Sequence, residues 1–120
     1  MRVRDTVTHR SDTPQPLRRA LIFIDEHARD PITLNEIAVA AGLSPRGLQA
    51  AFRRHLDTQP LAYVRSVRME RAHRDLQSAE PGDGVSVAAL AAKWGFTHLG
   101  RFAVEYRRRF GVHPSQTLRS

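Results

Sequence analysis

The sequence lacks cysteine entirely, contains a single lysine and has no long hydrophobic run. The absence of cysteine excludes disulfide frameworks, thiolate zinc sites and thiol catalysis. Apolar stretches such as Ala20 to Ile24 are too short for a membrane span or for the core of a signal peptide. We therefore expect a soluble, unsecreted protein that resides in the cytoplasm.

Motifs for metal binding and catalysis are missing as well. The six histidines stand at positions 9, 27, 55, 73, 98 and 113, so no two are three or four residues apart, as a helical metal site requires. The sequence has no glycine-rich phosphate loop and no GxSxG turn, and a short helical chain has little room for a catalytic pocket. We expect neither a metal nor a cofactor, and no enzymatic activity.

Basic residues are in excess. The 120 residues include 19 Lys and Arg against 12 Asp and Glu, a formal net charge of +7, and every basic residue except Lys93 is arginine. Recognition of phosphate or guanine through paired hydrogen bonds favours arginine in this way, and GC-rich coding explains the bias equally well. With 41% hydrophobic residues, the chain has enough apolar material for one small folded domain or two very small ones.

Helical periodicity and helix-capping residues predict an all-α fold without strands. Thr33 and Glu36 form a capping box, and Ser44, Ser86 and Thr97 are the predicted N-caps of later helices. We expect six main helices, near residues 17–28, 34–41, 45–56, 60–79, 87–94 and 98–110, with a last turn after Pro114. The predicted parts are a tail (1–13), a first helix-turn-helix subdomain (14–58), a linker helix (59–80) and a second helix-turn-helix subdomain (81–120).

The two halves of the sequence repeat one unit. Residues 34–42 align with residues 87–95 at an offset of 53, and residues 48–60 align with residues 102–114 at an offset of 54. Each copy has a short alanine-rich helix, a glycine turn and a second helix with apolar residues every four positions. This pattern is typical of a helix-turn-helix, whose second helix can enter the DNA major groove, although any antiparallel helix pair with a glycine turn shares it. Two copies in a basic chain favour the DNA-binding interpretation.

Several segments resemble the AraC/XylS-type DNA-binding domain. They are Gly42-Leu43-Ser44-Pro45, Arg68-Met69-Glu70-Arg71-Ala72, Trp94-Gly95-Phe96 and the closing run from Tyr106 to Ser115, and the resemblance extends over about Pro16 to Arg119. The resemblance implies a bacterial transcription regulator with two helix-turn-helix units joined by one rigid helix. In that family the domain usually ends a longer protein whose other part senses an effector.

The helix over 45–56 is the predicted reading helix of the first unit. Arg46, Gln49, Ala50 and Arg53 share one face of this helix, opposite the apolar residues. Arg46 suits guanine and Gln49 suits adenine, each through two hydrogen bonds, and both stand in the first turns, where a reading helix meets base edges. The resemblance also implies base contacts at these positions.

The second reading helix, over 98–110, has a different outward face. The equivalent positions are Gly100, Ala103, Val104 and Arg107, which offer few hydrogen-bonding groups. His98 and Arg101 are the polar candidates for base contact there, while Leu99, Ala103 and Val104 suit contact with thymine methyl groups. We therefore expect the first unit to set most of the sequence preference.

Other basic and hydroxyl side chains are predicted to hold DNA phosphates, which contribute affinity without reading sequence. Arg107, Arg108 and Arg109 spread over about 200° of a helix, so they cannot all face one strand. Aromatic residues of the second unit suit either base stacking or core packing, and their spacing favours the core: Trp94, Phe96, Phe102 and Tyr106. The predicted phosphate contacts are Ser44, Arg53, Arg54, Thr97, Arg107, Arg108 and Ser115.

The predicted partner is double-stranded DNA, with RNA polymerase as a further candidate. The alternative is a helical module that binds the transcription machinery, with only secondary, non-specific DNA binding. We expect the domain to bind DNA as a monomer, with any dimerisation through a further domain, and we expect a transcriptional activator associated with the nucleoid.

Overall fold

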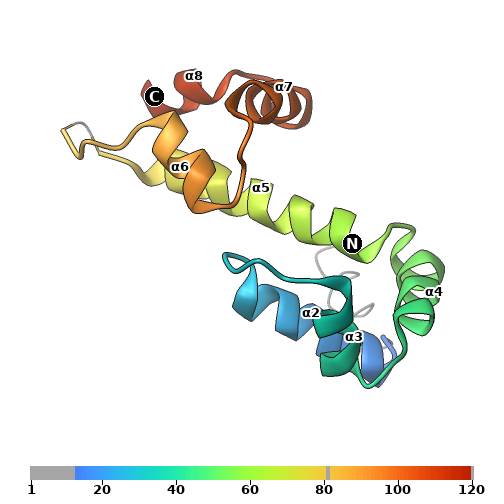
Figure 1. The fold of residues 1–120 in the computed structure, drawn as a ribbon. Helices are drawn as coiled ribbons and strands as arrows, with labels where there is room; N and C mark the ends of the chain where they lie inside the picture. Colours follow the sequence, from blue (N-terminus) through green and yellow to red (C-terminus); the bar gives the residue numbers. More distant parts are fainter. Residues whose placement is uncertain (1–12, 81, 120) are drawn as a thin grey trace. The chain divides into compact units, whose positions relative to one another are not determined.

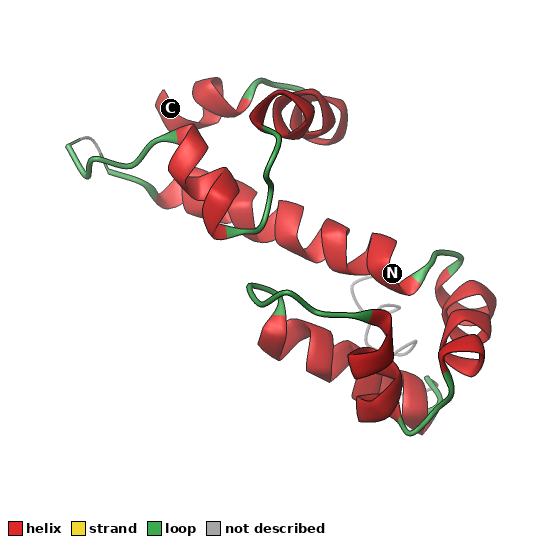
Figure 2. Ribbon diagram, viewed as in Figure 1, coloured by secondary structure: helices red, strands yellow, loops and turns green. Residues whose placement is uncertain are grey.

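The computed structural model describes residues 13–80 and 82–119, and the predicted tail lies outside these residues except for Thr13. The described residues form helices only, with no strand among them (Figure 2), in agreement with the predicted all-α class. The predicted last turn beyond Pro114 is part of a short helix that begins at Pro114 itself. The helices, labelled in Figure 1, are α2 (Gln15–His27), α3 (Leu34–Ala41), α4 (Pro45–Leu56), α5 (Pro60–Ser78), α6 (Val87–Lys93), α7 (Leu99–Phe110) and α8 (Pro114–Arg119). None of the described helices is long and apolar enough to cross a membrane.

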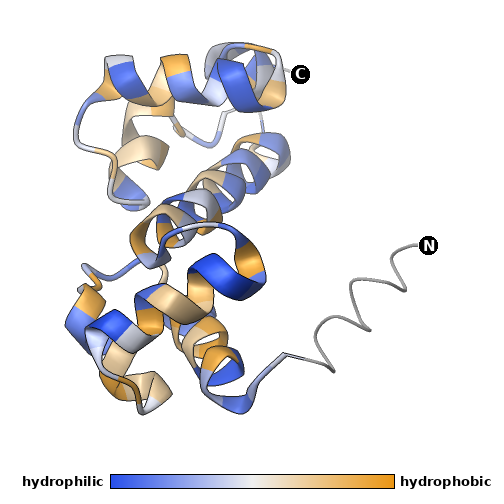
Figure 3. Cartoon of the chain, turned by 90° about the vertical axis from the view of Figure 1, so that its right-hand side faces the viewer, coloured by the Kyte–Doolittle hydropathy of each residue, from blue (hydrophilic) through white to orange (hydrophobic). Residues whose placement is uncertain are grey.

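The chain folds into two compact units. Of the described residues, the first contains 13–28 and Ile32–Val64, and the second contains Arg29–Pro31, 65–80 and 82–119. Helix α5 belongs to both, because the boundary lies between its fifth and sixth residues. Each unit therefore has its own core. Figure 3 shows that hydrophobic and hydrophilic residues alternate along the helices of both units, as expected for helices with one buried face.

The first unit begins its helices as the capping residues predict. The Thr33 hydroxyl accepts a hydrogen bond from the Glu36 backbone N–H (3.1 Å), and the Thr33 N–H donates to the Glu36 carboxylate (2.9 Å), which completes the capping box. The Ser44 hydroxyl caps α4 by accepting from the Gly47 N–H (3.0 Å). These caps start α3 and α4 at defined residues and so orient their buried faces. The core of this unit includes Leu17, Ala20, Ile24, Ile37, Ala38, Leu48 and Phe52.

The second unit has an aromatic core. The ring centroid of Phe102 lies 4.9 Å from that of Phe96 and 5.7 Å from that of Tyr106. The indole N–H of Trp94 donates to the Asp75 carboxylate (2.9 Å), which also accepts from Lys93 Nζ (2.8 Å). Burial acts to raise the pKa of Asp75, but these hydrogen bonds outweigh it and hold that pKa below its usual value. All four aromatic residues assigned to the core are buried, which confirms that assignment.

Equivalent positions of the two repeat copies are buried to a similar extent. Ile37 and Leu90, Leu48 and Phe102, Phe52 and Tyr106, and Pro60 and Pro114 are buried in both copies, while Leu56 and Phe110 are half-buried. The turns also agree. The Leu43 N–H donates to the carbonyl of Ala38 (3.0 Å), and the Phe96 N–H donates to the carbonyl of Ala91 (2.9 Å). The two units are therefore structural copies of one another, and the offset of 53 holds up to the residue after the turn glycine.

The start of α7 differs from the prediction. Thr97 does not cap this helix: the N-cap is His98, its side chain makes no capping hydrogen bond, and the helix begins at Leu99. Ser44 and His98 are equivalent N-caps, and Leu43 and Phe96 make equivalent turn hydrogen bonds. The extra residue of the second copy is therefore Thr97 itself. The predicted cap was wrong because a hydroxyl one residue too early in the chain cannot reach the free N–H groups of the first turn.

The turn glycine of the second unit provides a test of this backbone. Gly95 has a φ of +85°, and a Cβ there would lie 3.5 Å from the Arg68 guanidinium, an ordinary contact. Gly95→Ala should therefore destabilise the unit through backbone strain alone, by about 1–2 kcal/mol. Urea unfolding followed by the fluorescence of Trp94, the single tryptophan, measures this effect. Gly100→Ala is the control, because a Cβ there meets nothing within 4 Å; it should leave stability unchanged or raise it slightly. Equal effects of the two substitutions would contradict the positive φ.

Candidate nucleic-acid interface

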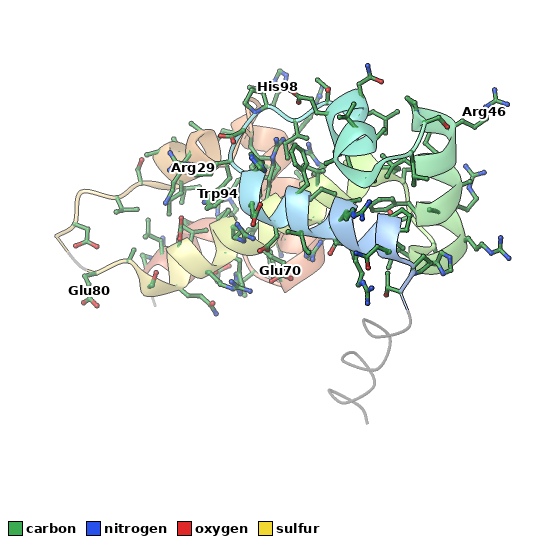
Figure 4. The ribbon with its side chains drawn as sticks, turned by 90° about the horizontal axis from the view of Figure 1, so that it is seen from below. Arg29, Arg46, Glu70, Glu80, Trp94 and His98 are labelled. Carbon is green, nitrogen blue, oxygen red and sulfur yellow. The ribbon has the colours of Figure 1, made fainter. Side chains whose placement is uncertain are left out.

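Helix α4 presents a polar face to solvent. Leu48 and Phe52 are fully buried, whereas Arg46, Gln49 and Ala50 are exposed. Because Pro45 is the first helical residue and Ser44 is the cap, Arg46 and Gln49 stand in the first turns of the helix. The structure therefore confirms that these side chains share an outward face, and Figure 4 shows Arg46 extending away from the helix.

The arginines of α4 remain available to a ligand. Arg46 makes no ion pair with any residue in the described ranges, and Arg53 and Arg54 are exposed in the last turn of the helix. A basic last turn also suits the helix dipole, whose negative end lies there. The first unit thus combines a polar face near the start of α4 with positive charge near its end.

Helix α7 presents an apolar face instead. Leu99 is 45% exposed and Val104 is 60% exposed, while Phe102 and Tyr106 on the opposite side are fully buried. Arg101 is exposed in the first turns. Large hydrophobic side chains that remain in water on a short helix provide surface for van der Waals contact but no hydrogen bonds. The outward face of α7 is therefore as poor in polar groups as the sequence predicts.

A small hollow lies at the start of α7. It is lined by three predicted site residues, Thr97, His98 and Arg101, together with Arg65 and Phe96. The Arg65 guanidinium lies 5.0 Å from the centre of the Phe96 ring. It also donates to both carboxylate oxygens of Glu105, at 2.7 to 3.0 Å. These hydrogen bonds raise the pKa of Arg65 against the opposing effect of partial burial.

The arginine triplet of α7 diverges, as its helical spacing predicts. Arg109 donates to the Glu70 carboxylate on α5 (3.0 Å), whereas Arg107 and Arg108 are exposed. Arg109 is therefore occupied within the second unit. All three side chains are exposed, and Arg107 and Arg108, the two that were predicted to hold phosphates, form no ion pair with a described residue.

The hydroxyl candidates are partly engaged in the protein. Ser44 caps α4, and the Ser115 hydroxyl lies 2.8 Å from Nδ1 of His113 in a half-buried position. Thr97 is exposed. Among the described residues, no group of three or more His, Asp or Glu side chains could hold a metal ion.

The structure adds functional candidates that the sequence analysis missed. Arg65 and Glu105 are 40 residues apart, and Glu70 and Arg109 are 39 apart. No local spacing connects such residues, so only folding brings them together. Both helices carry charged residues of both signs, which indicates that ion pairs can form between them. This pattern does not show which residue pairs with which.

Comparison with known proteins identifies the family. A helix-turn-helix domain family matches residues 37–120. The chain is 40% identical to a probable thc operon regulatory protein of Rhodococcus erythropolis over 89% of its length, and 39% identical to XylDLEGF operon transcriptional activator 2 of Pseudomonas putida over 83%. It spans 32% and 63% of the lengths of these two relatives.

A solved structure gives the same result. A probable AraC family transcriptional regulator from Rhodopseudomonas palustris superimposes with a TM-score of 0.80 at 36% identity, covering 88% of this chain and 96% of that one. These relatives are transcription regulators and not enzymes. The protein described here belongs to the AraC/XylS family of bacterial transcription regulators and forms that family's DNA-binding domain with two helix-turn-helix units.

Proposed function

We propose that this chain binds a specific, asymmetric sequence of double-stranded DNA, with α4 and α7 each in a major groove. The observation that carries the proposal is the exposed polar face at the start of α4. The major groove admits an α-helix and presents a distinct pattern of donors, acceptors and methyl groups for each base pair. A helix that holds Arg46, Gln49 and Ala50 in water has the chemistry to read that pattern.

In the first unit, Arg46 pairs with guanine O6 and N7, and Gln49 pairs with adenine N6 and N7. Ala50 lies beside them and adds close contact with the groove. The unoccupied guanidinium of Arg46 supports its assignment, because an arginine held by a carboxylate would first have to give up that partner. This unit supplies most of the sequence preference.

In the second unit, Leu99 and Val104 contact thymine methyl groups, while His98 and Arg101 are the polar base contacts. The exposure of the two apolar side chains supports this assignment, because contact with a methyl group removes them from water. Such contacts discriminate less than paired hydrogen bonds. The half-site bound by this unit is therefore the less stringent one.

Phosphate contacts hold both helices on the duplex. Arg53 and Arg54 serve this role on α4, Arg107 and Arg108 on α7, with the hydroxyls of Ser44, Thr97 and Ser115 as weaker contributors. The assignment to Arg107 and Arg108 is supported by the pairing of Arg109 with Glu70, which engages only the third arginine of the triplet.

In this proposal, helix α5 sets the spacing between the two reading helices, α4 and α7. Its 19 residues make it roughly 28 Å long, comparable to the pitch of about 34 Å in B-DNA. A monomer can then read two successive major grooves without the symmetry of a dimeric repressor. Bending of the DNA would help both units to place their reading helices in the major groove at the same time. We further propose that the chain contacts RNA polymerase and activates transcription.

Selection of bound sequences from a random DNA pool tests the proposal. We expect an asymmetric consensus about two helical turns long, with a guanine and an adenine strongly selected in one half and thymines weakly selected in the other. A pool that shows no enrichment after several rounds would exclude sequence-specific reading. A symmetric consensus would exclude binding as a monomer.

The dependence of binding on salt separates this function from that of a module that binds only the transcription machinery. Four arginine–phosphate contacts predict a slope of about −3.6 for the logarithm of affinity against the logarithm of salt concentration. Mobility shifts between 50 and 200 mM salt measure the slope on the selected site. Binding that is insensitive to salt, or absent at all salt concentrations, would favour the alternative.

A further inference from the structure

Two ion pairs of opposite polarity join α5 to α7 within the second unit. Arg65 of α5 donates to Glu105 of α7 at 2.7 Å, and Arg109 of α7 donates to Glu70 of α5 at 3.0 Å. His73 of α5 continues the contact, with its ring stacked on Phe110 at 3.9 Å and its Nδ1 lying 2.6 Å from the Tyr106 hydroxyl. Figure 1 shows α7 beside the part of α5 that belongs to this unit.

The order of the charges selects one register between the two helices. Along α5 the positive residue comes first and the negative one second, while along α7 the negative residue comes first. Glu105 and Arg109 are one turn apart on the same face of α7. A slip of α7 by one turn would bring Arg109 toward Arg65 and so oppose two positive charges.

Helix α4 has no counterpart of these two ion pairs at the equivalent positions, which lie in the described part of the chain. The positions of α4 that correspond to Glu105 and Arg109 in the repeat are Ala51 and His55. The two reading helices also differ in what their faces offer to DNA, since α4 carries long polar side chains and α7 carries Leu99 and Val104. Long side chains adjust to small displacements of a helix. Contact between an apolar side chain and a methyl group has no such reach, because a gap of about 0.5–1 Å already forfeits roughly a quarter to a half of the dispersion attraction.

We propose that Arg65 and Glu105 are positioning residues that, together with Glu70 and Arg109, hold α7 in the register needed for base discrimination by the second unit. The inference rests on the proposed DNA reading and assigns a task to side chains that do not read bases. All four side chains are partly exposed, and ion pairs of that kind contribute little to the stability of a fold. Because these two ion pairs attach α7 to α5 at two points, they fix the orientation of α7 instead.

Glu105→Gln provides the test. The substitution removes the negative charge that pairs with Arg65, leaves one amide oxygen as an acceptor in place of two carboxylate oxygens, and raises the net charge by one, so simple attraction to phosphates would strengthen binding to every sequence. We expect discrimination between the selected site and variants of its thymine-containing half to fall about 3- to 10-fold, part of what a full base contact provides. The melting temperature should fall by no more than a few degrees. Glu80→Gln makes the same change of charge in the exposed segment after α5 and should leave discrimination unchanged.

A double-mutant cycle completes the experiment. If Arg65 acts through Glu105, then Arg65→Gln combined with Glu105→Gln loses no more discrimination than Glu105→Gln alone. Additive losses would mean that Arg65 contacts the DNA directly and would overturn the inference, as would unchanged discrimination in Glu105→Gln. An unsubstituted chain with no sequence preference would instead reject the proposed function, so the two failures are distinguishable.

Discussion

Phe102→Ala should lower the free energy of unfolding of the second unit by about 3–5 kcal/mol. The Phe102 ring is fully buried, and it packs against Phe96 and Tyr106 at the centre of the aromatic core. Alanine would lose the burial of the ring and leave a cavity that surrounding helices fill only in part. Small domains have total stabilities of about 5–15 kcal/mol, so a loss of this size removes much of the folded population.

Urea unfolding monitored by Trp94 fluorescence measures this effect, because Trp94 belongs to the same unit. Val104→Ala is the matched control: it truncates an apolar residue of the same helix that is 60% exposed, and should change stability by less than about 0.5 kcal/mol. A loss of less than 1 kcal/mol for Phe102→Ala would show that this residue does not organise the core.

Arg46→Ala should relax discrimination at one base pair at a cost of about 1–3 kcal/mol, equivalent to a loss of about 5- to 150-fold in affinity for the preferred base. The substitution removes a side chain that extends into solvent from the second residue of α4, so the fold should be unaffected. Dissociation constants for duplexes carrying each of the four base pairs, position by position, reveal which pair has become degenerate.

Arg53→Ala is the natural control for Arg46→Ala, since both remove one exposed arginine from α4. As a phosphate contact, Arg53 should weaken binding to all sequences about equally and reduce the magnitude of the salt slope by about one. If Arg46→Ala leaves the preferred sequence unchanged, the assignment of the reading face of α4 is wrong.

Features that depend on neighbouring residues were predictable. The capping box at Thr33, the cap at Ser44 and the positive φ of Gly42 each involve residues at most a few positions apart. The repeat added a second, independent constraint, because equivalent positions must be buried alike. The one wrong prediction of this kind is the N-cap at Thr97, whose hydroxyl stands one residue before the true N-cap. The repeat offset of 54 places His98, and not Thr97, at the position equivalent to Ser44.

Amino-acid order alone thus determined the all-helical class, the duplicated unit, the aromatic core of the second unit and the outward faces of α4 and α7. These follow from helical periodicity, which relates residues three or four positions apart. The tertiary structure alone decided the pairing of Arg65 with Glu105 and of Arg109 with Glu70, and with it which arginine of the α7 triplet is held by a carboxylate. The reason is distance along the chain: a contact between side chains about 40 residues apart depends on how whole helices pack, and no local pattern encodes it.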